Sequence, residues 1–109
     1  MTDRELLELA AKAAGLRGRW PVPDYDMQFT PAGIWCPGMG EGQLWNPLTD
    51  DGDALRLAVK LRIDVAHARD YVVSGLGTAG SMRRENGDDC TATRRAIVRA
   101  AAEIGRSMP

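Results

Sequence analysis

The stretch LWNPLTDDGDALRLAVKL, Leu44–Leu61, holds a dense acidic cluster directly ahead of an apolar pattern. Its carboxylates are Asp50, Asp51 and Asp53. The apolar residues that follow recur with the spacing of a helix. A carboxylate at a helix start accepts backbone N–H bonds and complements the positive end of the helix dipole. The stretch therefore predicts a helix from about Asp51 to Leu61, capped by Asp50 or a neighbour.

Metal binding and catalysis are the alternative roles for this acidic cluster. An EF-hand calcium loop needs alternating oxygen ligands, a glycine at its sixth position and a late glutamate. The motif DDGD lacks that spacing. Helix capping explains the three carboxylates without any bound ligand, so we expect neither a metal nor a cofactor. In this helix we expect Arg56 and Lys60 to face outward, and the buried side to consist of Ala54, Leu55, Ala58, Val59 and Leu61.

Helices are also predicted near both ends of the sequence. Thr2 and Glu5 form a capping-box pattern and Gly15 is a typical C-cap, which predicts a helix from about Asp3 to Ala14. A further helix is predicted to start after Asp88 or Asp89 and to run to about Arg106. Its apolar stripe consists of Ala96, Ile97, Ala100, Ala101 and Ile104.

Strand patterns lie between the second and third predicted helices. Ile63 and Val65 alternate with other residues, and Tyr71–Ser74 is a second short run typical of a strand. With a turn at 68–70, the two runs predict a hairpin. Ser81–Glu85 is a candidate third strand, because the turn signal Asn-Gly follows it.

The segment 17–47 has a different composition from the rest of the chain. It contains five of the six prolines and all three tryptophans. Proline excludes a long helix, and the aromatic content is too high for a disordered linker. We predict an ordered, irregular segment with one or two short strands, near Met27–Phe29 and Gly33–Cys36.

Together these patterns predict one α+β domain over residues 1–109. A small, mainly antiparallel sheet packs with three helices, in the order α-β-α-β-β-α. The apolar fraction of 44% and the charged fraction of 27% are ordinary for a soluble globular protein. A net charge of −1 argues against a broad electrostatic surface for nucleic acid or an anionic membrane.

Location and redox state are inferred from what the sequence lacks. The N-terminal residues have no long apolar core of a signal peptide, and no apolar run is long enough to span a bilayer. We therefore expect a cytoplasmic protein without a membrane partner. In that reducing compartment, Cys36 and Cys90 are expected to be free thiols.

Two strings, WNPLTDDGDALRLAVKL (Trp45–Leu61) and TRRAIVRAAAEIG (Thr93–Gly105), resemble a family of small phage and prophage proteins with an α/β/α ("phage ABA") sandwich domain. MTDRELLELAAKAAG, Met1–Gly15, is similar to that family too. The resemblance implies a phage origin and a sandwich fold, and it carries over no catalytic residue. Residues 17–42 and 75–89 depart from the family pattern.

No catalytic constellation is complete in the sequence. His67 is the only histidine, no G-x-S-x-G elbow occurs, and neither Cys36 nor Cys90 has the C-x₂-C partner typical of a zinc site. The glycine-rich run Gly38–Gly42 lacks the spacing and the lysine of a phosphate-binding loop. We therefore expect that the protein is not an enzyme.

The aromatic residues Trp20, Tyr25, Trp35 and Trp45 are the first candidate binding site. Exposed aromatic side chains on loops are typical of protein-recognition hot spots. Burial in the core is an equally good reading, because the chain has only one phenylalanine. A homodimer through the same residues is a further alternative.

Arginines on and near the third helix are the second candidate site, for nucleic acid. They are Arg83, Arg84, Arg95 and Arg99. A basic helix beside basic loops contacts phosphates in many nucleic-acid-binding proteins. A solvated charged face opposite the apolar stripe accounts for them more simply.

The expected function is therefore binding rather than catalysis. The first hypothesis is a phage or prophage accessory protein that binds a host or phage protein, as a component of host takeover or anti-defence. The second hypothesis is a nucleic-acid-associated protein that uses the arginines.

Overall fold

The computed structural model describes residues 2–18, 20, 33–36, 43–67, 71–74, 82–83 and 89–109. Its helices are α1 (Asp3–Ala14), α2 (Asp51–Leu61) and α3 (Asp89–Arg106). Its strands are β1 (Ile34–Cys36), β2 (Gln43–Trp45), β3 (Val65–His67), β4 (Tyr71–Ser74) and β5 (Met82–Arg83). The fold is α+β, as predicted. The predicted strand near Met27–Phe29 and the run Gly38–Gly42 lie outside the described residues.

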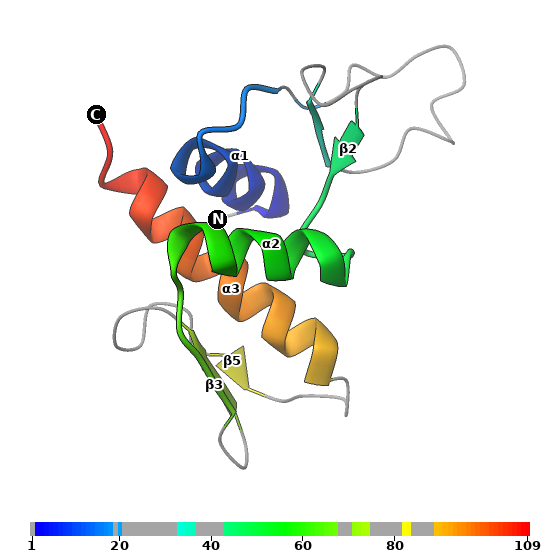
Figure 1. Cartoon of the computed structure of the whole chain (residues 1–109), viewed down its shortest axis with the longest axis vertical. Helices are drawn as coiled ribbons and strands as arrows, with labels where there is room; N and C mark the ends of the chain where they lie inside the picture. The colour runs from blue at the N-terminus through cyan, green and yellow to red at the C-terminus, as the bar shows by residue number, and fades with distance from the viewer. Residues whose placement is uncertain are drawn as a thin grey trace.

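Helix α3 is the centre of the arrangement. It contacts α1, α2, β4 and β5, and α1 also contacts β1. Figure 1 shows the β1–β2 hairpin at the end of the molecule beside α1, and β3 and β5 at the opposite end. The helices therefore form a layer between two small sheets.

The two sheets are antiparallel throughout their described strands. In the first, Ile34 of β1 pairs with Trp45 of β2. In the second, the strand order is β3-β4-β5, and Val65 of β3 pairs with Ser74 of β4. The predicted hairpin and its third strand are confirmed. The predicted order of elements lacked β2. This strand has only three residues and leads directly into Asn46, so it is too short for an alternating apolar pattern to be visible in the sequence.

The helix ends follow the capping patterns of the sequence. The Thr2 hydroxyl accepts a hydrogen bond from the Glu5 amide, and Gly15 adopts the left-handed conformation with φ of 71°. The Asp50 side chain accepts the Asp53 amide at 2.8 Å. Helix α2 ends on Arg62, a non-glycine residue with φ of 54°. The capping role of Asp50 is thus confirmed.

The main core lies between α1 and α3 and extends to β1 and β2. It includes Leu7, Ile34, Trp45 and Val98, together with many alanines from the helices. Small side chains let helices approach closely, and at Gly105 of α3 there is no room for a Cβ beside the backbone of α1.

Candidate functional site: an apolar groove between α2 and α3

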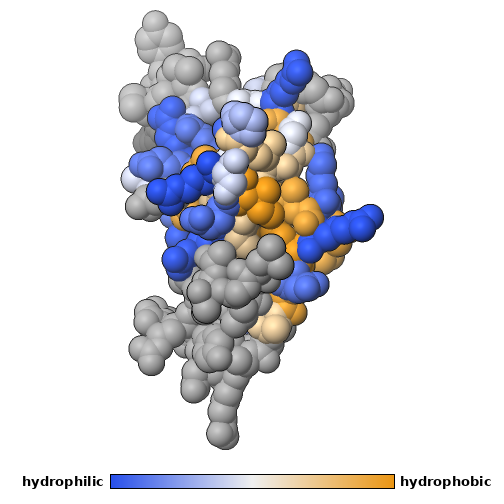
Figure 2. All heavy atoms as spheres, turned by 90° about the vertical axis from the view of Figure 1, so that its left-hand side faces the viewer, coloured by the Kyte–Doolittle hydropathy of each residue, from blue (hydrophilic) through white to orange (hydrophobic). Residues whose placement is uncertain are grey.

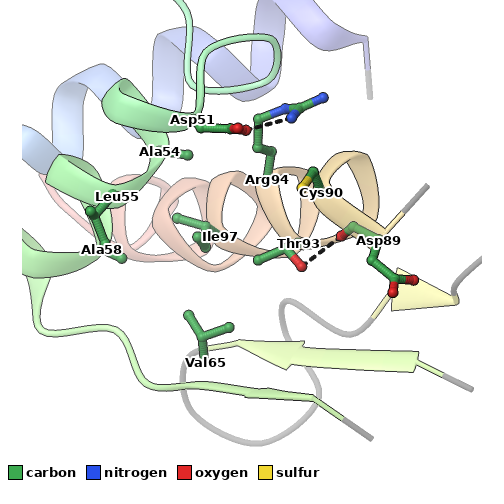
Figure 3. Close-up of a pocket in the computed structure, with 10 residues that line it drawn as sticks. All are labelled: Asp51, Ala54, Leu55, Ala58, Val65, Asp89, Cys90, Thr93, Arg94 and Ile97. Carbon is green, nitrogen blue, oxygen red and sulfur yellow. Dashed lines mark hydrogen bonds and ion pairs between the residues drawn. The ribbon is translucent and has the colours of Figure 1, made fainter. Parts of the chain in front are cut away.

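An apolar groove runs between the N-terminal halves of α2 and α3. Its volume is about 420 Å³, and its accessible lining is almost entirely apolar. Figure 3 shows the side chains that line it; they are Asp51, Ala54, Leu55 and Ala58 from α2, Val65 from β3, and Asp89, Cys90, Thr93, Arg94 and Ile97 from α3.

The floor of the groove follows from helical spacing. Ala54 and Ala58 of α2 are one turn apart, as are Thr93 and Ile97 of α3, so each pair lies on one face of its helix. Val65 lies across from them at the start of β3 (Figure 3). The small alanine side chains leave the space that larger residues would fill.

Arg94 closes one end of the groove and joins three parts of the chain. Its guanidinium donates to the Leu48 carbonyl at 2.8 Å, to Asp51 at 2.5 Å and to the Thr91 hydroxyl at 3.0 Å. The Arg94 side chain is only 16% exposed, whereas that of Asp51 is 71% exposed. All three guanidinium nitrogens therefore donate within the chain.

The other polar groups at the groove are a hydroxyl, a thiol and two carboxylates. The Thr93 hydroxyl donates to the Asp89 carbonyl at 2.7 Å. Cys90 is an exposed free thiol on the first turn of α3. Within the described residues, no group of three or more His, Cys, Asp or Glu side chains is placed to hold a metal ion. The accessible surface of the groove is almost entirely apolar in spite of these polar groups.

Two apolar residues of α2 do not lie where the sequence predicted them. Leu55 and Val59 were expected on the buried side of α2, but they are 64% and 69% exposed. The buried residues of α2 are Ala54, Leu57 and Ala58. Apolar residues occupy more of the circumference of this helix than a single buried stripe requires. That excess is the signal in the sequence for a second apolar face. Figure 2 shows hydrophobic residues gathered between hydrophilic ones across one face of the molecule.

The aromatic candidates do not form one exposed surface. Trp45 lies in the core with 6% exposed, which matches the alternative reading of core packing for this residue. Trp20 packs against the same core, and the Arg4 guanidinium lies over its ring at 5.7 Å. Trp35 is 41% exposed on β1. Tyr25 lies outside the described residues.

The arginine candidates are partly engaged by other side chains. Both terminal nitrogens of Arg95 donate to Asp3 at 3.1 Å, which ties α3 to the start of α1. Arg99 is exposed and also has an interaction within the chain. The side chain of Arg83 and the whole of Arg84 lie outside the described part of the structure.

The two cysteines are free and differ in environment. Burial, and secondly the nearby Asp53 carboxylate, raise the pKa of the Cys36 thiol. A thiol with a raised pKa stays protonated and is a poor nucleophile. His67 is the last residue of β3, and its side chain lies outside the description.

The three aspartates of the acidic cluster have different structural roles. Asp50 caps α2, Asp51 binds Arg94, and Asp53 accepts the Asn46 amide at 3.0 Å and binds Arg56 at 2.8 Å. These bonds join the end of β2 to α2 and α3.

Comparison of the chain with models of protein families, with characterised proteins and with solved structures finds no match. No helix within the described ranges is long and apolar enough to cross a membrane.

Proposed function

We propose that this chain is a non-catalytic binding protein of phage or prophage origin, which holds an apolar segment of a host or phage protein in the groove between α2 and α3. The observation that carries the proposal is the apolar lining of the groove, which continues onto the exposed Leu55. Contiguous exposed apolar surface marks interaction sites in soluble proteins. The protein acts in the cytoplasm of the host, as part of takeover or anti-defence.

The shape of the groove favours a protein segment over a small molecule. Small-molecule sites enclose most of the ligand surface. Here Leu55, one of the lining residues, is 64% exposed, so the apolar surface of the groove is open to solvent along α2. A chain segment with several apolar side chains covers both the groove and its rim, as peptides do in helix-lined grooves.

The polar groups around the groove support binding rather than catalysis. Arg94 donates to three acceptors of its own chain, so it is poorly placed to stabilise charge on a substrate. Thr93 donates back to its own helix. Of the two carboxylates in the lining, Asp51 binds Arg94 and Asp89 stands at the start of α3.

The groove replaces the aromatic residues as the proposed contact surface. Trp45 is core, and Trp20 is half-buried beneath Arg4. The nucleic-acid alternative receives no specific support, because the described Arg95 is paired with Asp3.

Affinity capture from host cells, with and without phage infection, tests the proposal. Thr93→Glu places a charge and extra volume in the groove, and Thr49→Glu makes the same change in the turn before α2, outside the groove. We expect one protein to be captured by wild type and by Thr49→Glu, and to be lost with Thr93→Glu. Captured proteins that ignore Thr93→Glu, or no reproducible partner, would overturn the proposal.

A salt series separates protein binding from nucleic-acid binding. Binding to phosphates weakens steeply as salt rises, whereas apolar contacts do not. We expect the captured protein to stay bound when the salt concentration is raised and when nuclease is added. Release of the partner by either treatment would favour the arginines instead.

A further inference from the structure

The outward face of α2 carries an apolar pair that no described element covers. Leu55 and Val59 are one turn apart, so they form a ridge along the helix. Leu55 also borders the groove, but Val59 is not part of the groove lining. The ridge therefore borders the groove, shares Leu55 with it and extends beyond it at Val59.

The same helix is charged oppositely at its two ends. Asp50, Asp51 and Asp53 stand at its start, and Lys60 and Arg62 stand at its end. Lys60 and Arg62 are exposed, and neither forms an ion pair with any residue in the described ranges. By contrast, Asp51 keeps most of its side chain in solvent while it binds Arg94.

We propose that a second copy of this chain docks on the ridge, with its own α2 antiparallel to the first. A two-fold axis then passes near the middle of α2. Leu55 lies against the second copy's Val59, and Val59 lies against its Leu55. Such an isologous contact uses one patch twice, because every contact occurs in both directions.

The charges at the two ends of α2 favour a second copy in the antiparallel orientation. In that arrangement Arg62 of each copy approaches Asp51 of the other, so the basic end of one helix meets the acidic end of the other. A parallel copy would place like charges together, which is unfavourable. The net charge of −1 also leaves little long-range repulsion between copies.

The proposed contact between the two copies is small. Helix α2 has 11 residues. It is therefore about 16 Å long, so a contact through this helix alone is at the small end of specific interfaces. We expect a weak, reversible dimer with a Kd on the order of 10–100 µM.

Sedimentation over a concentration series tests the dimer. We expect wild type to shift from monomer to dimer, Val59→Arg to remain monomeric, and Trp35→Arg to behave like wild type, with circular dichroism confirming that each variant is folded. Trp35 is an exposed apolar residue on β1, away from the ridge. The Trp35→Arg variant therefore also tests whether an aromatic residue forms the dimer interface. A wild type that stays monomeric up to about 1 mM, or a dimer that survives Val59→Arg, would overturn the proposal.

Disulfide trapping tests the register without relying on a disruptive variant. In a Cys90→Ser background, Leu55→Cys and Val59→Cys chains are mixed and oxidised. We expect the mixed disulfide to form at least several-fold faster than either self-disulfide. Equal rates for the three pairings would exclude the antiparallel register. The test reads self-association only, so its failure leaves the groove and its Thr93-dependent partner unaffected.

Discussion

Gly105 of α3 packs directly against the backbone of Leu9 in α1. A Cβ placed at position 105 would lie 2.9 Å from the Leu9 carbonyl carbon and would overlap the carbonyl oxygen. Real Cβ atoms do not approach backbone atoms this closely, so one of the helices would have to move. The contact makes position 105 a sensitive probe of the helix layer.

We predict that Gly105→Ala lowers the free energy of unfolding by about 1–3 kcal/mol, the usual cost of overpacking. Helix propensity alone would favour alanine by about 1 kcal/mol, so the sign of the result decides between the two effects. Gly52→Ala is the control, because its Cβ would meet only the ends of side chains, those of Arg56 at 3.1 Å and Asp50 at 3.2 Å, and no backbone atom. Urea unfolding measures both; equal stabilisation of the two variants would contradict the close helix contact.

The cap of α2 gives a second prediction. Asp50→Ala removes the acceptor of the Asp53 amide and should cost about 1 kcal/mol, whereas Asp50→Asn should cost little, since asparagine caps equally well. Asp64→Ala is an exposed control outside the helix. Thermal unfolding compares the three variants. Equal losses for alanine and asparagine would show that charge, rather than capping, is the main contribution of Asp50.

The left-handed Arg62 gives a third prediction. A non-glycine residue in this conformation costs about 1–2 kcal/mol, and glycine removes that cost but loses more backbone entropy. We expect Arg62→Gly to raise the melting temperature slightly while it weakens self-association. Arg62→Asn, which also tolerates this conformation, should be stabilised less. A lower melting temperature for Arg62→Gly would argue that the arginine side chain itself stabilises the fold.

The thiols give a fourth prediction. Cys90 is exposed and should react readily with a maleimide, while Cys36 is buried with a raised pKa and should react only after unfolding. Mass spectrometry of the labelled peptides distinguishes the two sites. Since both thiols are free, the melting temperature should be the same with and without reductant. A clear drop on reduction would instead reveal a disulfide.

Labelling Cys90 also offers an independent check of the groove. A bulky polar maleimide on this thiol would stand at the groove lining and should block capture of the partner. The same label on a Cys90→Ser chain has no site in the groove and should leave capture unchanged. Full binding by the labelled wild type would count against the groove as the contact surface.

Local signals in the sequence were sufficient for the helices. The bounds of α1 and α2 follow from Thr2, Gly15 and Asp50, each of which acts on the backbone within a few residues. The hairpin β3–β4 was visible for the same reason. The third strand β5 lies within the run Ser81–Glu85 that was the candidate for it.

Features that depend on distant contacts were missed. Strand β2 exists through its pairing with β1, and Trp45 is buried by that pairing and by the helices. The exposure of Leu55 and Val59 depends on which face of α2 meets α3, and the apolar pattern of α2 is compatible with more than one choice. The groove is consequently a property of helix placement, and no short motif encodes it.

The packing of α1 on α3 has a consequence for synthesis on the ribosome. Leu9 is translated long before Gly105, yet each completes the surface of the other. Until α3 has emerged, α1 lacks the element with which it makes most of its contacts, and a helix of 12 residues is marginal in water by itself. We therefore expect α1 to become stably packed only after α3 has been synthesised.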